Sequence, residues 1–408
     1  MSSLPWIMGR KQRPAVSCLA PRRQWPCYNR NFASRLYAVG LFGDNRDVEG
    51  ATVMNACYGG TAALLSSVAW AESSAWVAEK PYAIYVAGDV AVYEAGPARP
   101  TGGCGAVAVL VGRDAPVQLL PGARASYAED AYDFYKPVMG SEYPIVDGKD
   151  SQVCYARALD ACYMQYARRL DVADGVDAAR GIRESSGHVL FHSPYNKLVQ
   201  QSFQRLLFLD AVRALAAGVT LPADMEPLRP WAEPCAGTCD PAVWEPTYTD
   251  RGLAAATKAV DAAVGGYDRY VAAGASASQR VGNTYTGALH ANLLGLIDQK
   301  AGSLRGTRAT AFSYGSGLIA TMFGLDFPAD HSGPFTVERI AETAKLSCSL
   351  DSRVRAEPEV FSNAMRMREA AYGKASFSPA GSVADVAPGA WYLEGVDGQW
   401  RRSYARKA

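Results

Sequence analysis

The sequence has almost no excess charge of either sign. Its 408 residues include 41 lysines and arginines and 40 aspartates and glutamates, which gives a net charge of +1. A chain with this balance has no overall electrostatic attraction for nucleic acid or for an anionic membrane surface. We therefore expect neither as a partner, and the partners have to be inferred from individual sites.

A long apolar run of the kind that faces lipid is also missing. The longest stretch without a charged residue, 50–71, contains Asn55 and the adjacent glycines Gly59 and Gly60. A membrane-spanning helix needs about 20 predominantly apolar residues. This stretch instead predicts a buried strand, a turn and a helix inside a globular protein.

The cysteines do not form a disulfide pattern. There are nine of them, an odd number, scattered along a long chain, which favours reduced thiols in the cytosol or an organelle interior. Residues 235–239, CAGTC, hold only two thiols and have no second Cys/His pair to complete a zinc site. We expect no bound metal.

The first 43 residues lack any acidic residue but contain seven lysines and arginines, and four prolines interrupt them. We interpret this stretch as an atypical basic N-terminal segment of a cytoplasmic protein. A mitochondrial or plastid leader is the alternative, because such leaders are also basic and poor in acidic residues.

From residue 50 onward, short apolar runs alternate with longer helical patterns, which is typical of an α/β protein with helices on both faces of its strands. Strands are predicted at 82–89, 105–112, 188–192 and 307–313. Helices are predicted at 154–170, from Pro194 onward, at 252–265 and at 287–298. Residues 218–248 carry six prolines, so we expect them to form an irregular surface excursion.

Two residues stand where chemistry is often found. Cys57 lies between an apolar stretch and a helix predicted to start near Thr61, where the helix dipole would lower the pKa of its thiol. His192 ends a predicted strand just before a helix, as functional residues of open α/β sheets often do. A buried structural cysteine and a buried structural histidine are the alternatives that these positions alone leave open.

Several motifs, taken in order, resemble one enzyme family. They are NACYGGTAAL (55–64), AGDVAVYEAGPARPTGG (87–103), YDFYKP (132–137), SEYPIVDGK (141–149), FHSPYNKLVQ (191–200), GNTYT (282–286) and FSYGSGL (312–318). Together they resemble hydroxymethylglutaryl-CoA synthase (HMG-CoA synthase), and the similarity extends from about residue 44 to the C-terminal WYLEGVDGQWRRSYAR (391–406).

The resemblance implies a thiolase-like layered αβαβα fold of two related halves, here with a shortened N-terminal half, in a homodimer. We expect an N-terminal synthase region at 44–118 and a C-terminal region at 119–408. The implied reaction condenses acetyl-CoA with acetoacetyl-CoA and water, an early step of mevalonate, isoprenoid and sterol synthesis. Both acyl-CoA molecules are substrates, and no cofactor is implied.

The matched motifs also imply roles for individual residues. Cys57 corresponds to the acetylated nucleophile, and His192 to the histidine that polarises the acetoacetyl group. A nucleophilic thiolate next to an imidazole suits covalent acyl transfer. Expected acyl-CoA contacts are Thr101, Ser151, Lys197, Asn283 and Ser316. Pro97 stands where some relatives have asparagine.

One expected residue has no counterpart. The family uses a glutamate upstream of the cysteine as general acid/base, and residues 1–43 contain no carboxylate. The sequence therefore predicts acetylation of Cys57 with little condensation product. It leaves open a catalytically impaired or silent relative that binds acyl-CoA. A synthase for carrier-bound acyl groups is a third possibility, but the RRSYAR block at 401–406 argues against it.

Overall fold

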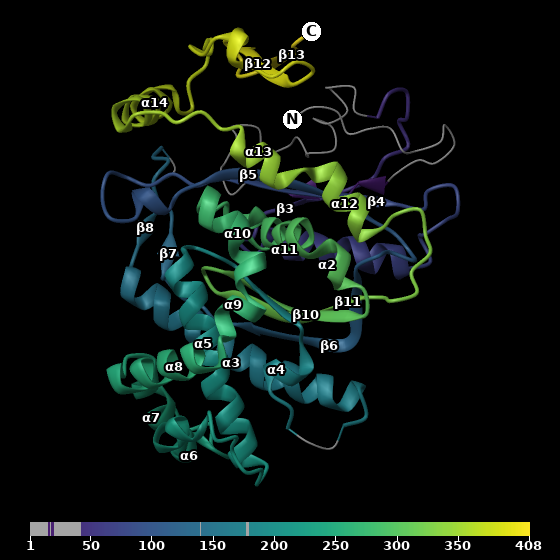
Figure 1. Cartoon of the computed structure of the whole chain (residues 1–408). Coiled ribbons are helices and arrows are strands. Elements are labelled where there is room, and N and C mark those ends of the chain that lie inside the picture. Colours follow the sequence, from purple (N-terminus) through teal and green to yellow (C-terminus); the bar gives the residue numbers. More distant parts are fainter. Residues whose placement is uncertain (1–14, 17, 20–41, 139, 177–178) are drawn as a thin grey trace.

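The structure is a computed structural model that describes residues 15–16, 18–19, 42–138, 140–176 and 179–408. Most of the basic N-terminal segment expected at 1–43 lies outside these residues. Within the described residues, a sheet, a helical layer, a second sheet and a second helical layer follow one another (Figure 1). This order confirms the layered α/β fold expected from the sequence.

The first sheet is built on β4 (Ala83–Val90) and β5 (Cys104–Val111), which pair antiparallel along their full length. The short β1 (Ala15–Val16) pairs parallel with β4. Alternate residues of β4 are buried, because successive side chains of a strand point to opposite faces. Both long strands were predicted within one or two residues.

The second sheet has the order β6, β11, β10, β9. Its strands are β6 (Gln118–Ala128), β11 (Ile319–Phe327), β10 (Thr307–Gly315) and β9 (His188–Phe191). β9 runs parallel to β10, whereas the other neighbours are antiparallel. β9 and β10 are the two strands of this sheet that the sequence predicts. His192 follows the carboxyl end of β9, and Ser316 follows that of β10.

Helices α2 (Gly59–Glu72), α10 (Ala272–Val281) and α11 (Ala288–Leu304) separate the two sheets (Figure 1). On the other face of the second sheet lie α3 (Gly148–Ala173) and α5 (Asn196–Ala216), with α8 (Arg251–Val264) packed on α5. α3 is longer than predicted because the carboxylate of Asp147 caps it, accepting bonds from the amides of Lys149 and Asp150.

Two expected starts are wrong by a few residues. α2 begins at Gly59 rather than near Thr61, and α5 begins at Asn196, so Pro194 precedes the helix instead of standing in its first turn. The strand expected before the turn is only β3 (Thr52–Val53), whose first residue is exposed. A buried strand at this position is therefore not observed.

The prediction of an irregular surface excursion at 218–248 is also wrong. The segment forms short helices: η2 (Glu226–Leu228), α6 (Arg229–Cys235), α7 (Pro241–Trp244) and η3 (Glu245–Tyr248). Each has a proline in its first turn, where the missing amide proton costs nothing. Leu228 and Ala232 of this segment are fully buried in the main core, so it is packed rather than projecting.

The remaining elements are shorter or lie toward the C-terminus. They are β2 (Cys18–Leu19), β7 (Phe134–Tyr135), β8 (Ile145–Val146), η1 (Arg99–Thr101), α4 (Ile182–Ser185), α9 (Gly266–Tyr270), η4 (Tyr285–Gly287), α12 (Val337–Ala344), α13 (Leu346–Asp351), α14 (Pro358–Ala371), η5 (Val383–Asp385), β12 (Trp391–Val396) and β13 (Arg402–Arg406). β12 and β13 form a C-terminal antiparallel hairpin.

Candidate functional site

Cys57 stands at the corner between β3 and α2, as the sequence predicted. It is 9% exposed, and α2 begins two residues later at Gly59. The preceding residue, Ala56, has φ of +42°, in the left-handed region that residues other than glycine seldom adopt. The chain therefore turns sharply just before the thiol and enters the helix just after it.

The first turn of α2 is tied to the second sheet by side-chain hydroxyls. The Tyr58 hydroxyl lies 2.7 Å from Oγ1 of Thr321 in β11, and Thr61 donates to Oγ of Ser313 in β10 at 2.7 Å. The backbones also approach closely, since a Cβ on Gly315 would stand 2.7 Å from the Tyr58 amide nitrogen. These contacts hold the Cys57 corner against the ends of β10 and β11.

An aromatic cluster surrounds Cys57. The thiol is grouped with Ala91, Tyr93 and Tyr285, and Phe134 packs against this group. The ring centroids of Tyr93, Phe134 and Tyr285 are 6.0 to 6.4 Å apart, with the ring planes at steep angles. Three segments that are distant in the sequence thus form an apolar wall around the sulfur.

Asn283 connects this wall to Thr101. Its Oδ1 accepts a bond from the Tyr285 amide at 2.8 Å, and its Nδ2 donates to the Tyr93 hydroxyl at 3.4 Å. Its own amide donates to the carbonyl of Thr101 at 2.8 Å. The structure therefore brings together two of the predicted acyl-CoA contacts, Thr101 and Asn283, and places Asn283 on the Cys57 cluster. The exposed Pro97 directly precedes Ala98, which also packs on the cluster.

His192 follows directly after β9 and is 2% exposed. Its amide donates to the carbonyl of Phe312 in β10 at 2.8 Å, and its carbonyl accepts a bond from the Tyr155 hydroxyl at 2.8 Å. Backbone contacts on both sides thus fix the position of this residue. Burial raises the pKa of Tyr155 well above its usual range, so its hydroxyl stays protonated and able to donate.

Tyr314 of β10 contacts Tyr155, the residue bonded to the His192 carbonyl. Its ring centroid is 4.9 Å from that of Tyr155, and its hydroxyl donates to Oδ2 of the buried Asp133 at 2.7 Å. Burial raises the pKa of Tyr314 most, and the Asp133 carboxylate raises it further. Tyr314 therefore contacts both Tyr155, which bonds to His192, and Asp133, which directly precedes Phe134 of the wall around Cys57.

The other predicted contacts lie at varying distances from this centre. Ser316 is half-buried in the turn that follows Gly315, next to the Cys57 corner. Ser151 is half-buried one turn before Tyr155, and so on the same face of α3. Lys197 is exposed in the first turn of α5, five residues after His192.

Sequence reasoning missed the aromatic residues of the site. Tyr93, Phe134, Tyr285 and Tyr314, together with Asp133, all lie inside the motifs that carry the family resemblance. The motifs were therefore a sufficient signal for their presence, but only the fold shows that they face one another.

No cluster of metal-ligating side chains is found among the residues that the structure describes. Of the CAGTC pair, Cys235 is buried in the main core and Cys239 is exposed. No helix in the described ranges is long and apolar enough to cross a membrane.

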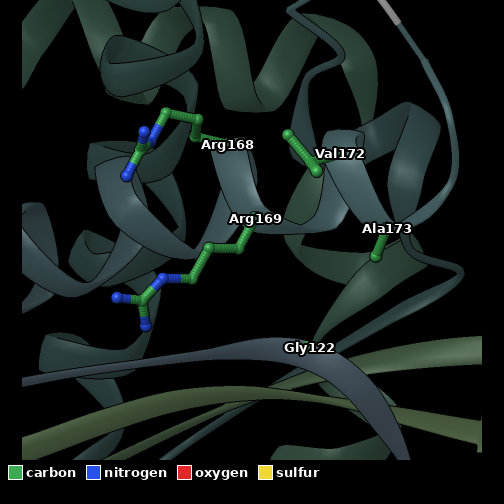
Figure 2. A pocket seen from close by; sticks show the side chains of 5 residues that line it. All are labelled: Gly122, Arg168, Arg169, Val172 and Ala173. Carbon is green, nitrogen blue, oxygen red and sulfur yellow. The ribbon is translucent and has the colours of Figure 1, made fainter.

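A surface cavity of about 380 Å³ lies elsewhere on the molecule. Figure 2 shows it between Gly122 of β6 and the α3 residues Arg168, Arg169, Val172 and Ala173. It shares no lining residue with the cluster around Cys57, and we do not associate it with the chemistry of the site.

Comparison with known proteins identifies the family. The sequence matches the N-terminal family model of hydroxymethylglutaryl-coenzyme A synthase over residues 29–116 and the C-terminal model over 117–407. It is 41% identical over 374 residues to the mitochondrial hydroxymethylglutaryl-CoA synthase of Bos taurus, covering 90% of this chain and 71% of that protein. It is 40% identical over 371 residues to the cytoplasmic enzyme of Gallus gallus, covering 89% and 68%.

Solved structures give the same result. The fold superposes on MvaS in complex with 3-hydroxy-3-methylglutaryl coenzyme A with a TM-score of 0.77 at 26% identity, covering 97% of this chain and 82% of that one. PksG, an HMG-CoA synthase from Bacillus subtilis, shares the fold with a TM-score of 0.71 at 19% identity, covering 98% and 83%. The thiolase-like fold expected from the sequence is thereby confirmed. The chain belongs to the hydroxymethylglutaryl-CoA synthase family.

Proposed function

We propose that this chain is an acyltransferase that condenses acetyl-CoA with acetoacetyl-CoA and water to give HMG-CoA and free CoA, with Cys57 as the nucleophile. The observation that carries the proposal is the placement of Cys57 at the start of α2, inside the aromatic cluster of Tyr93, Phe134 and Tyr285. The first-turn amides and the helix dipole favour a thiolate at such a position.

The first half of the proposed reaction transfers the acetyl group. The Cys57 thiolate attacks the thioester carbonyl of acetyl-CoA, the new sulfur–carbon bond forms, and CoA leaves with its sulfur as thiolate. The apolar wall around the sulfur keeps water away from the acetyl-cysteine until the second substrate arrives.

The second half forms a carbon–carbon bond, and we assign His192 to it. A general base takes a proton from the acetyl methyl group, the resulting carbanion attacks the ketone carbonyl of acetoacetyl-CoA, and the ketone oxygen takes up a proton to become the hydroxyl of the product. Water then adds to the thioester carbonyl and the bond to sulfur breaks, which releases the product as a carboxylate and restores the Cys57 thiol. A donor held by fixed backbone contacts can stabilise the charge that develops on the ketone oxygen. The bond that the His192 amide donates to Phe312 and the bond that its carbonyl accepts from Tyr155 support such a fixed position.

We assign substrate binding to Thr101, Ser151, Lys197, Asn283 and Ser316. The exposed ammonium of Lys197 suits an anionic part of CoA, and the neutral side chains suit carbonyl and amide groups of the acyl arm. The link from Asn283 to both Thr101 and Tyr285 supports a binding role next to Cys57.

Assembly and location complete the proposal. We propose a homodimer in the cytoplasm, with a mitochondrial or plastid location as the alternative. Relatives of both the mitochondrial and the cytoplasmic kind match this chain to a similar degree.

The test separates the two halves of the reaction. HMG-CoA formation from both substrates measures the whole reaction, and mass spectrometry after acetyl-CoA alone measures the first half. His192→Ala should keep the acetyl adduct but lose condensation, since only the second half is assigned to this imidazole. If the wild-type protein forms HMG-CoA normally but His192→Ala abolishes the acetyl adduct on Cys57, the assigned role of His192 is wrong. If the wild-type protein is acetylated on Cys57 but makes little or no HMG-CoA, the proposed condensation is wrong and the alternative of a catalytically impaired relative holds.

A further inference from the structure

Helix α14 contacts the rest of the molecule through polar side chains. This fully described helix has no buried residue of its own. Its partners belong to the segment around β7 and β8, where Nε of Arg368 lies 2.9 and 3.1 Å from the two carboxylate oxygens of Glu142. Just beyond the helix, the Tyr372 hydroxyl accepts a bond from Lys136 at 3.0 Å. Figure 1 shows α14 above this segment.

The Arg368–Glu142 ion pair is partly shielded from solvent. The side chain of Glu142 is 4% exposed and that of Arg368 is 38% exposed. Breaking an ion pair that involves a buried carboxylate is costly, because the carboxylate loses a charge-assisted bond in a medium of low polarity. Arg368 therefore fixes the position of Glu142 more firmly than a surface ion pair could.

The segment that carries Glu142 also carries Phe134. β7 and β8 pair antiparallel, with Phe134 opposite Val146. The base of this hairpin is closed by a bond from the Asp147 amide to the carbonyl of Asp133 at 3.1 Å. The hairpin is thus held at its base by backbone contacts and on its outer side by α14.

Phe134 is the point where this hairpin reaches the site. Its ring centroid lies 6.0 Å from that of Tyr285 and 6.4 Å from that of Tyr93, in the wall around Cys57. A displacement of β7 would move Phe134 and open the wall on that side.

We propose that Arg368 and Glu142 are positioning residues, whose ion pair holds the β7–β8 hairpin so that Phe134 closes the apolar wall beside Cys57. This inference rests on the proposed function of Cys57. The pair acts through Phe134 and shields the acetyl thioester from water. When the wall opens, water adds to the thioester carbonyl, and the products are acetate and the free Cys57 thiol.

The test compares Arg368→Gln with Arg366→Gln, a change in the same helix at a residue whose guanidinium bonds to Asn363 of that helix. Arg368→Gln should lower kcat/KM by about tenfold, because a small displacement of Phe134 disturbs the geometry around the reacting thioester. It should also raise the ratio of acetyl-CoA hydrolysis to condensation, which a loss of stability alone would not change. Arg368→Lys should recover part of the activity, and Arg366→Gln should leave both quantities unchanged.

A double variant tests whether the pair acts through Phe134. Phe134→Leu should itself raise the hydrolysis ratio, and Phe134→Leu with Arg368→Gln should be no worse than Phe134→Leu alone. Additive effects, or an Arg368→Gln variant that behaves like Arg366→Gln, would overturn the proposal.

Hydrogen exchange gives a readout that needs no turnover. The amides of β7 and β8 should exchange at least about tenfold faster in Arg368→Gln than in wild type or Arg366→Gln. Equal exchange in all three proteins would refute the positioning role, even if the wild type proves inactive. If Arg368→Gln exchanges faster than the wild type but the wild-type protein is inactive, the positioning role holds and only the proposed function has failed.

Discussion

The main-chain carbonyl of His192 accepts a hydrogen bond from the hydroxyl of Tyr155, with 2.8 Å between the two oxygens. Tyr155 lies on α3 and His192 follows β9, so this bond fixes the end of a strand from the helix that covers the sheet. The ring of Tyr155 packs on Phe312 and Tyr314, which keeps its hydroxyl directed at this carbonyl.

Tyr155→Phe should therefore impair the step that uses His192. The ring contacts remain, and the loss of one buried hydrogen bond should cost about 1 kcal/mol of stability. We expect kcat for HMG-CoA formation to fall severalfold, while acetylation of Cys57 proceeds at the wild-type rate. Steady-state kinetics and a single-turnover acetylation assay check both expectations.

Tyr166→Phe is the matched control. Tyr166 is also buried in α3, and its hydroxyl lies 3.0 Å from Oγ1 of Thr310, away from His192. It should lose similar stability and keep its kcat. Equal losses of kcat in the two variants would mean that the Tyr155 bond has no particular role in the site.

Gly60→Ala should displace the helix that begins next to Cys57. A Cβ at Gly60 would lie 2.3 Å from the Thr286 carbonyl oxygen and 2.5 Å from Nε2 of His290. Backbone cannot yield as a flexible side chain can, so α2 has to shift, and we expect a loss of about 1–3 kcal/mol of stability. Alkylation of Cys57 should slow in the same variant, as followed by mass spectrometry.

Gly148→Ala provides the comparison for that substitution. Gly148 is the first residue of α3, and a Cβ there would meet no atom within 4 Å. The change should leave stability unchanged or raise it by up to about 1 kcal/mol, since alanine restricts the unfolded chain. A Gly60→Ala variant as stable and as reactive as Gly148→Ala would contradict the close packing of α2 on α11.

The long regular elements could be predicted from the sequence because their signals are local. The apolar runs that became β4 and β5 and the patterns that became α8 and α11 need no knowledge of distant residues. The prediction for 218–248 fails because a proline can begin a helix as well as break one. Four of the six prolines stand in the first turns of short helices, and Leu228 and Ala232 of these helices are buried in the core.

The site could be predicted only in part. The cysteine and histidine stand at strand-to-helix junctions that the sequence indicates, and family motifs named further candidates. The wall around Cys57 could not be predicted, because Tyr93, Phe134 and Tyr285 come from three separate segments. Likewise, nothing local indicates that Tyr58 contacts Thr321, a residue 263 positions away.

His290 should contribute to the loss of stability in acid. It lies buried between α2 and β4, with its Nδ1 2.9 Å from the Tyr85 hydroxyl, and burial lowers its pKa to about 4. Between pH 6.5 and 4 the unfolded chain binds a proton that the folded protein does not. The stability that depends on a neutral His290 is therefore present above pH 6.5 and is lost as the pH falls toward 4, by about 3 kcal/mol.

His290→Gln should flatten that part of the pH profile, since an amide does not titrate. Denaturant unfolding from pH 7 to pH 4.5 measures it, with Tyr85→Phe as the control that retains the imidazole and its acid dependence. A His290→Gln profile parallel to that of wild type would show that His290 does not contribute to the acid dependence of stability.

Peptide mass spectrometry after brief incubation with acetyl-CoA shows whether Cys57 is the acetylated nucleophile. We expect an acetyl group on the Cys57 peptide of the wild-type protein, its absence in Cys57→Ala, and its retention when the exposed Cys104 is replaced by serine. An acetyl group that remains in Cys57→Ala, or that is found on another cysteine in the wild type, would contradict this role of Cys57.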